Sequence, residues 1–137
     1  MIACRSKPVF VRESMFTLVK DTSAGDLPAI DLVHLARQTD GDEALEAELL
    51  AMFDAQAAKL AARLALPEVG AQAKADIAHR LKGSALAIGA WRVAEAATAA
   101  ETHFAMVATG GSGNGDPLAL LQAAVDEARA TITSLTA

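Results

Sequence analysis

The stretch DPLALLQAAVDEARATITSL, residues 116–135, carries the clearest structural pattern in the chain. Asp116 is a residue type favoured at the N-cap of a helix, and Pro117 suits the first helical position. Apolar side chains then recur every three or four residues, which places them along one helix face. These side chains are Leu118, Leu121, Val125, Ala128, Ile132 and Leu135. The pattern predicts a long helix that buries this stripe against other helices.

Two helices joined by a short turn are predicted upstream of this one. The glycine-rich run from Thr109 to Gly115 predicts a flexible loop. Before the loop, a helix from about Trp91 is expected to bury five apolar side chains, Val93, Ala97, Ala100, Phe104 and Val107. The preceding helix is expected to run from about Ala71 to Ile88, because Gly89 suits a helix stop.

A short helix and another long helix come earlier in the chain. Asp31 is expected to cap a short helix whose apolar residues are Leu32, Leu35 and Ala36. A turn follows, in which Asp40 and Glu43 have the spacing of a capping box. The next helix is expected to end near Pro67, with apolar residues at Leu45, Leu49, Met52, Phe53, Leu60 and Leu64. Residues 27–137 are therefore predicted to form an all-α domain, an antiparallel four-helix bundle with an additional short N-terminal helix.

The composition indicates one helical domain. The 137 residues are 53% hydrophobic but only 4% aromatic, and the apolar residues are mostly Ala and Leu. The net charge of −5 argues against nucleic acid as a partner. The single cysteine, Cys4, cannot form an internal disulfide, and no stretch is apolar enough for a signal peptide or a membrane span, so a cytoplasmic location is expected. Residues 1–26 are treated as an N-terminal extension to which the pattern assigns no structure.

The segment AHRLKGSALAIGA, residues 78–90, contains the side chains that point to chemistry. At about 100° per residue, its helix turns one side to the core, with Ile77, Leu81, Ser84, Ala85 and Ile88. His79 points the opposite way, into solvent. Gly83 lies one turn after His79, where it leaves room beside the imidazole, although glycine costs up to about 1 kcal/mol relative to alanine inside a helix. Lys82 places a cation near the same space.

This arrangement suits transfer of a phosphoryl group. An exposed imidazole is largely neutral at physiological pH, so a ring nitrogen is free to attack phosphorus. Catalysis of such a transfer is mainly positioning and charge neutralisation, and Lys82 could pair with the phosphoryl oxygens while Gly83 keeps the approach open. Leu86 and Ala90 extend an apolar strip that could seat the protein delivering the group, and Arg80 adds a charge that could aid docking.

The motif from His79 to Ser84, HRLKGS, with Gly89-Ala90 after it, resembles the signature of histidine-containing phosphotransfer (HPt) domains. The resemblance extends over about residues 27–135. It implies a carrier protein of a two-component phosphorelay, with His79 as the phosphoacceptor and Lys82 and Gly83 around the phosphate. It also implies a monomer whose partners are response-regulator receiver domains and a hybrid histidine kinase. The aspartate and the Mg²⁺ of the reaction would belong to the receiver, so no cofactor is expected on this chain.

Glu101 occupies a position at which the HPt family often carries glutamine. In that family the glutamine, on the helix after the histidine, forms a hydrogen bond with the active imidazole. A carboxylate could accept the Nδ1 proton and leave Nε2 as the nucleophile. The resemblance therefore makes Glu101 a candidate for orienting His79, although the residue type differs.

Two other functions fit parts of the same pattern. A non-catalytic helical adaptor could bind a receiver or kinase domain through the apolar surface around Leu86. The phosphoacceptor bundle of a histidine kinase would need an ATP-binding domain, and nothing in the chain resembles one, so a carrier without kinase activity is expected. His34 and His103 are interpreted as surface residues, and no metal site is expected. Ser84 is interpreted as a packing residue that bonds back to its own helix, and Trp91 as an anchor at a helix start.

Overall fold

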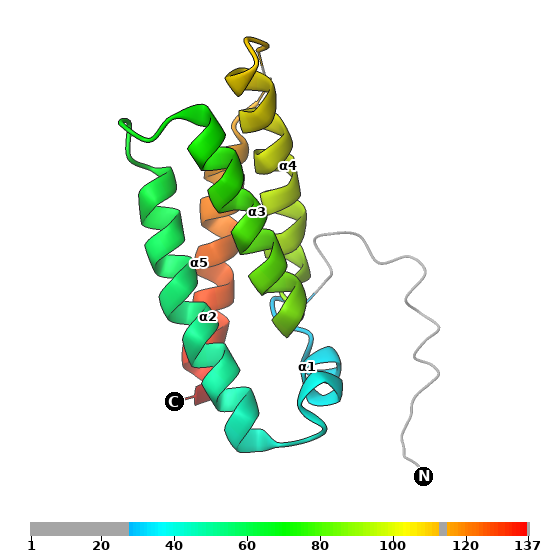
Figure 1. Cartoon of the computed structure of the whole chain (residues 1–137). Helices are drawn as coiled ribbons and strands as arrows, with labels where there is room; N and C mark the ends of the chain where they lie inside the picture. Colours follow the sequence, from blue (N-terminus) through cyan, green and yellow to red (C-terminus); the bar gives the residue numbers. More distant parts are fainter. Residues whose placement is uncertain (1–27, 113–114, 137) are drawn as a thin grey trace.

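The computed structural model describes residues 28–112 and 115–136, and every element in these ranges is a helix (Figure 1). The helices are α1 (Leu32–Thr39), α2 (Glu43–Leu64), α3 (Ala71–Ile88), α4 (Trp91–Ala108) and α5 (Pro117–Thr136). The all-α prediction is confirmed. The N-terminal extension and positions 113–114 of the expected loop lie outside the described residues. No helix in the described ranges has the length and apolar character needed to cross a membrane.

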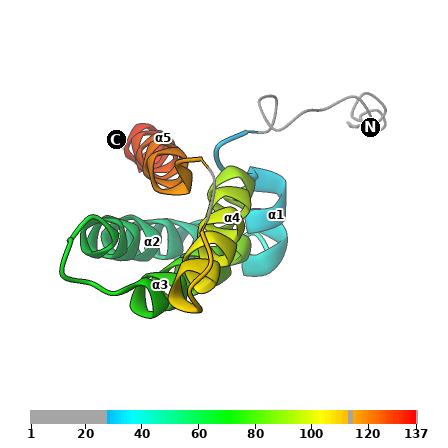
Figure 2. The same cartoon turned by 90° about the horizontal axis from the view of Figure 1, so that it is seen from above.

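Helices α2 to α5 form a bundle in which successive helices run in opposite directions (Figure 1). Seen along the bundle, α3 and α5 stand on either side of α2 and α4, and α1 lies to one side (Figure 2). The short helix α1 packs where α2 begins and α3 ends. The predicted four-helix bundle with a short extra helix is therefore confirmed.

The core runs along the middle of the bundle and draws on all five helices. Its largest fully buried side chains are Leu35, Leu64, Leu81, Leu121, Val93 and Val125. Between α3 and α4 the buried residues are mostly small, and short side chains let helix axes approach closely. Five of the apolar residues predicted along the helices are exposed and lie outside the core: Leu32, Leu45, Met52, Val107 and Leu135. Four of them lie in the first or last turns of their helices, where fewer neighbouring side chains are within reach. Met52, in the middle of α2, is 66% exposed.

Asp31 joins α1 to the turn between α3 and α4. It caps α1 by accepting a hydrogen bond from the His34 backbone N–H at 3.0 Å. Its own N–H donates to the Gly89 carbonyl at 2.9 Å, and its Oδ2 accepts from Trp91 Nε1 at 2.9 Å. Gly89 has φ 81°, and a Cβ there would lie 2.9 Å from the Asp31 Cβ, so this turn requires glycine. The predictions for Asp31, Gly89 and Trp91 are confirmed.

Two local predictions near α2 and α3 were wrong. Asp42, and not Asp40, caps α2 by accepting from the Leu45 N–H at 3.1 Å. Asp40 has φ 55° and ends α1, so its side chain is not placed to cap the next helix. Ser84 is half-buried and donates to Gln56 Oε1 of α2 at 2.8 Å, because it sits on the edge of α3 that faces α2. It therefore links two helices and does not bond back to its own.

Candidate functional site

The imidazole of His79 projects from the outer face of α3. Its side chain is 65% exposed. The neighbouring residues Ala78 and Leu81 have no exposed surface, and their burial fixes the rotation of α3 about its axis. The solvent-facing position predicted for His79 is therefore confirmed, and the packing of α3 against the bundle explains it.

Glu101 reaches the imidazole from α4. Its Oε2 lies 3.0 Å from His79 Nδ1, and its Oε1 lies 3.2 Å from Lys82 Nζ. Ala97 and Ala100 are completely buried on the inner side of α4, which leaves Glu101 at the edge of the helix that borders α3. A carboxylate can only accept a hydrogen bond, so Nδ1 must carry the proton in this contact. The lone pair of the neutral ring is then on Nε2.

The contacts of Glu101 change its acidity. Partial burial by itself raises the pKa of the carboxyl, but hydrogen bonds from Lys82 and His79, and the charges of both, outweigh it. The pKa of Glu101 is therefore lowered from its ordinary value. At neutral pH the group is a carboxylate that can hold the Nδ1 proton in place.

Gly83 and Gly89, the two glycines of the motif, are present for different structural reasons. A Cβ at Gly83 would meet no atom within 4 Å, whereas at Gly89 it would collide with Asp31. Gly83 lies inside α3, and its backbone does not have positive φ. Neither packing nor conformation therefore requires glycine at position 83. What the missing side chain provides is open space one turn from the imidazole.

The docking residues predicted from the sequence separate into an exposed and a buried set. Arg80 is exposed, and Leu86 is 45% exposed on the side of α3 that carries His79. Ala90 is completely buried, so its predicted place in an apolar docking strip was wrong. The prediction assumed that the helix continues through Ala90, but α3 ends at Ile88 and Gly89 turns the chain. The Ala90 N–H then donates a hydrogen bond to the Ala85 carbonyl.

Leu86 borders a pocket of about 260 Å³ between α3 and α4. The lining residues are Lys82, Leu86, Trp91, Ala94, Glu95 and Thr98. Glu95 and Thr98 were missed by the sequence reasoning. They stand six and three positions before Glu101 on α4, and this spacing places all three on one side of the helix. This spacing relative to Glu101 is the sequence signal from which Glu95 and Thr98 could have been predicted.

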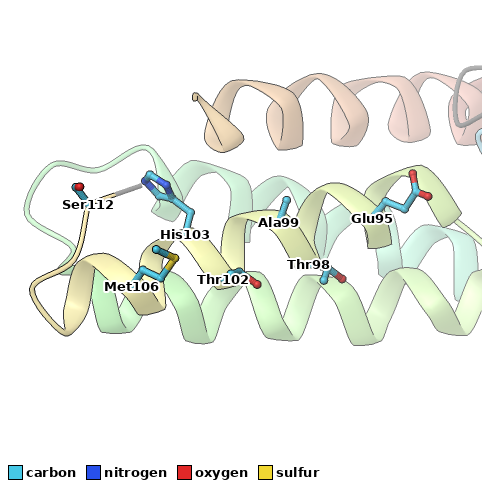
Figure 3. A pocket seen from close by; sticks show the side chains of 7 residues that line it. All are labelled: Glu95, Thr98, Ala99, Thr102, His103, Met106 and Ser112. Carbon is cyan, nitrogen blue, oxygen red and sulfur yellow. The ribbon is translucent and has the colours of Figure 1, made fainter. Parts of the chain in front are cut away.

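A second hollow continues along the outer surface of α4 from Glu95 to Ser112 (Figure 3). It has a volume of about 540 Å³. His103 and Ala99 lie along the side of α4 nearer α5 in this view, while Thr98 and Thr102 lie along the side nearer α3. The two pockets share Glu95 and Thr98, so the surface beside the candidate site is hollowed along much of α4.

The other two histidines are half-buried, and their prediction as surface residues was wrong. His34 Nε2 lies 3.0 Å from the Leu86 carbonyl oxygen, and its ring meets the Trp91 ring edge-on with centroids 4.8 Å apart. His103 packs edge-on against Phe104, and its buried Nδ1 has no hydrogen-bond partner among the described residues. In the described ranges, no three His, Cys, Asp or Glu side chains gather into a group that could hold a metal ion.

A comparison with protein-family models identifies the chain. The model described as the Hpt domain matches residues 48–131, more than half of the sequence. The chain belongs to the Hpt domain family. This HPt domain has no significant match among curated proteins or solved structures. HPt domains are phosphotransfer carriers of phosphorelay signalling that interact with kinase and receiver domains. The matched span contains His79, Lys82, Gly83 and Glu101.

Proposed function

We propose that this HPt domain carries a phosphoryl group on Nε2 of His79 and exchanges it with aspartates of response-regulator receiver domains, one of them in a hybrid histidine kinase. The observation that carries the proposal is the exposed imidazole whose Nδ1 is held 3.0 Å from Glu101. This contact selects the tautomer with a free lone pair on Nε2, and it stops rotation of the ring. The reactive nitrogen is thus presented to an approaching protein.

The transfer step balances without an added reactant. Nε2 attacks the phosphorus of the receiver's aspartyl phosphate, a P–N bond forms, and the P–O bond to the aspartate breaks. The aspartate leaves as a carboxylate. No proton has to move, because Nδ1 keeps its hydrogen throughout. The product ring is positively charged, and the Glu101 carboxylate stabilises that charge. Transfer onward reverses these steps, with Mg²⁺ held by the receiver.

Lys82 supplies the positive charge for the phosphoryl oxygens. Its ammonium pairs with Glu101 at 3.2 Å, one turn from His79, and its flexible stem lets it move between the carboxylate and an incoming phosphoryl group. Positive charge placed near the transferring group is the main electrostatic aid that such a reaction needs. Lys82 and Glu101 therefore act around His79 from opposite sides of the α3–α4 interface.

The test is to mix the purified protein with a receiver domain carrying radioactive aspartyl phosphate. We expect label to appear on this chain in a form that survives alkali and is lost in acid, as a P–N bond requires. A receiver that binds but leaves the chain unlabelled would favour the adaptor interpretation. Label that withstands acid would place the phosphate on another residue type and contradict the proposal.

Gly83→Gln is expected to slow phosphoryl transfer and at the same time to stabilise the fold. A long side chain would fill the open space beside the imidazole and slow transfer by about 100-fold, the cost of a misplaced reacting group. The same change should raise the free energy of unfolding by up to about 1 kcal/mol, because glycine is a poor helix former. Gly83→Ala is the control, since its Cβ meets no atom, and it should gain stability while keeping fast transfer. Equal transfer rates for the Gln and Ala variants would show that the space at position 83 has no role.

A further inference from the structure

An apolar groove of about 360 Å³ lies between α4 and α5. Five of its lining residues are apolar: Ala96, Ala99, Pro117, Leu120 and Ala124. Ala96 and Ala124 pack against the core and form the floor of the groove. Leu120 is 68% exposed, the largest value among the exposed large apolar side chains of the described ranges. A continuous apolar surface of this kind is typical of a site that another apolar segment covers.

The α4–α5 groove lies away from the face that carries His79. Ala99 is on the side of α4 nearer α5 (Figure 3), whereas Glu101 reaches His79 from the edge of α4 that borders α3. The body of α4 therefore separates the groove from the imidazole. A short segment bound in the groove leaves Nε2 of His79 accessible to a receiver.

The charged residues of the groove gather at the end where α4 begins. These residues are Arg92 and Glu95. The Arg92 guanidinium donates to both carboxylate oxygens of Glu127 on α5, at 2.7 and 2.8 Å. Glu95 is exposed and forms no ion pair with a residue of the described ranges. This end of the groove therefore presents a carboxylate to an incoming cation.

The beginning of the sequence has the chemistry that matches this groove. Residues 1–20 contain one acid, Glu13, and four cations, Arg5, Lys7, Arg12 and Lys20. Residues 28–136 contain fourteen Asp and Glu against eight Lys and Arg, so the two parts attract each other. Within residues 9–19, which we call the apolar segment, the apolar side chains include Phe10, Met15, Phe16 and Leu18. Burial of these side chains in an apolar groove is favourable.

The chain enters the described part beside the charged end of the groove. Ile30 is buried in the core, and the Asp31 N–H donates to the carbonyl of Gly89, just before α4 begins. Figure 2 shows this stretch passing the start of α4 on the side toward α5. The 18 residues of α4 span about 27 Å, whereas residues 1–27 can extend to about 90 Å. The apolar segment can therefore reach the whole length of the groove.

We propose that the apolar segment, residues 9–19, binds the α4–α5 groove of its own chain, with the cations beside it near Glu95. The covalent connection gives the segment an effective concentration of about millimolar at the groove, well above that of a second molecule in dilute solution. Binding covers Leu120 and so removes an apolar surface that would otherwise associate with other proteins. The inference does not depend on phosphotransfer, because the groove contains none of the residues around His79.

The experiment uses Cys4, the single cysteine of the sequence, to report where the segment lies. A nitroxide attached to Cys4 of the full chain broadens the nuclear magnetic resonance signals of nearby groups. We expect broadening of the methyl signals of Ala96, Ala99 and Leu120, and none at Met52 on α2. A mixture of isotope-labelled chain without nitroxide and unlabelled chain with nitroxide should show no broadening, because each segment binds its own groove.

Two matched variants of the full chain test the contact itself. Leu120→Asp should lower the ratio of bound to free segment about 10-fold and weaken the broadening, because it removes apolar area from the groove. Met52→Asp is the control: Met52 is 66% exposed, so the same change is made on an equally accessible side chain outside the groove and should have no effect. Phe16→Asp should repeat the result of Leu120→Asp. Thermal melts establish that each variant is folded.

Three results would overturn the inference. The first is a wild-type chain with no broadening at the groove, or with equal broadening at Met52. The second is the same response in Leu120→Asp and Met52→Asp, since the groove would then have no special part. The third is broadening in the mixed sample as strong as in the single chain, which would assign the groove to a second copy. Labelling by a phosphorylated receiver is unaffected in every case.

Discussion

His79→Gln is expected to abolish labelling of the chain by a phosphorylated receiver, and it should leave the bundle folded. Glutamine keeps a polar side chain at the position but has no nucleophilic ring nitrogen. The side chain is 65% exposed, so the free energy of unfolding should change by no more than about 0.5 kcal/mol. Label incorporation and a thermal melt, measured on the same preparation, check both parts.

The other two histidines supply matched controls. His34→Gln and His103→Gln should both keep labelling, because the first ring bonds to the Leu86 carbonyl and the second has a buried Nδ1. His34→Gln should lose about 1 kcal/mol of stability with the loss of one hydrogen bond. Labelling of the His79 variant at the wild-type level, or its loss in either control alone, would assign the phosphoacceptor to a different residue.

Ile88→Asp is expected to unfold the protein, with a loss of more than about 4 kcal/mol. Ile88 is 3% exposed within the core, so an aspartate there would bury a charge without a partner. Circular dichroism during heating measures the effect. The same substitution two residues earlier should have a different outcome, because the helix turns that position outward.

Leu86→Asp is the matched variant. Leu86 is 45% exposed, so the new carboxylate stays in water and the melting temperature should hardly move. Receiver binding should weaken by about 2 kcal/mol, or roughly 30-fold, because the substitution removes apolar contact from the centre of the docking surface. A stable Ile88→Asp together with an unfolded Leu86→Asp would mean that the assigned faces of α3 are inverted. The exposed position of His79 would then be wrong too.

The helical period predicted much of this site because α3 is regular from Ala71 to Ile88. It placed His79 and Leu86 outward and Ile88 inward, as the structure has them. It failed at Ala90, where the left-handed Gly89 ends the helix and the projection no longer applies. Periodicity carries information only along an unbroken helix, so the first residue after a stop lies beyond it.

Contacts between residues far apart in the sequence could not be predicted from helical periodicity. His34 lies 52 residues from the Leu86 carbonyl that it meets, and no local pattern predicts that pairing. The choice of Asp42 over Asp40 as the cap of α2 depended on backbone angles, since both positions carry the same residue type. The family motif suggested Glu101 as a partner of His79, whereas its second contact, with Lys82, became visible only in the structure.

The most direct test of the central claim is nuclear magnetic resonance of the phosphorylated protein with ¹⁵N-labelled histidine. Coupling between phosphorus and nitrogen identifies which ring atom carries the phosphoryl group. We predict that the coupling falls on Nε2 of His79 and that Nδ1 still carries its proton, held by Glu101. Phosphorus on Nδ1, on another histidine, or on no nitrogen at all would contradict the account.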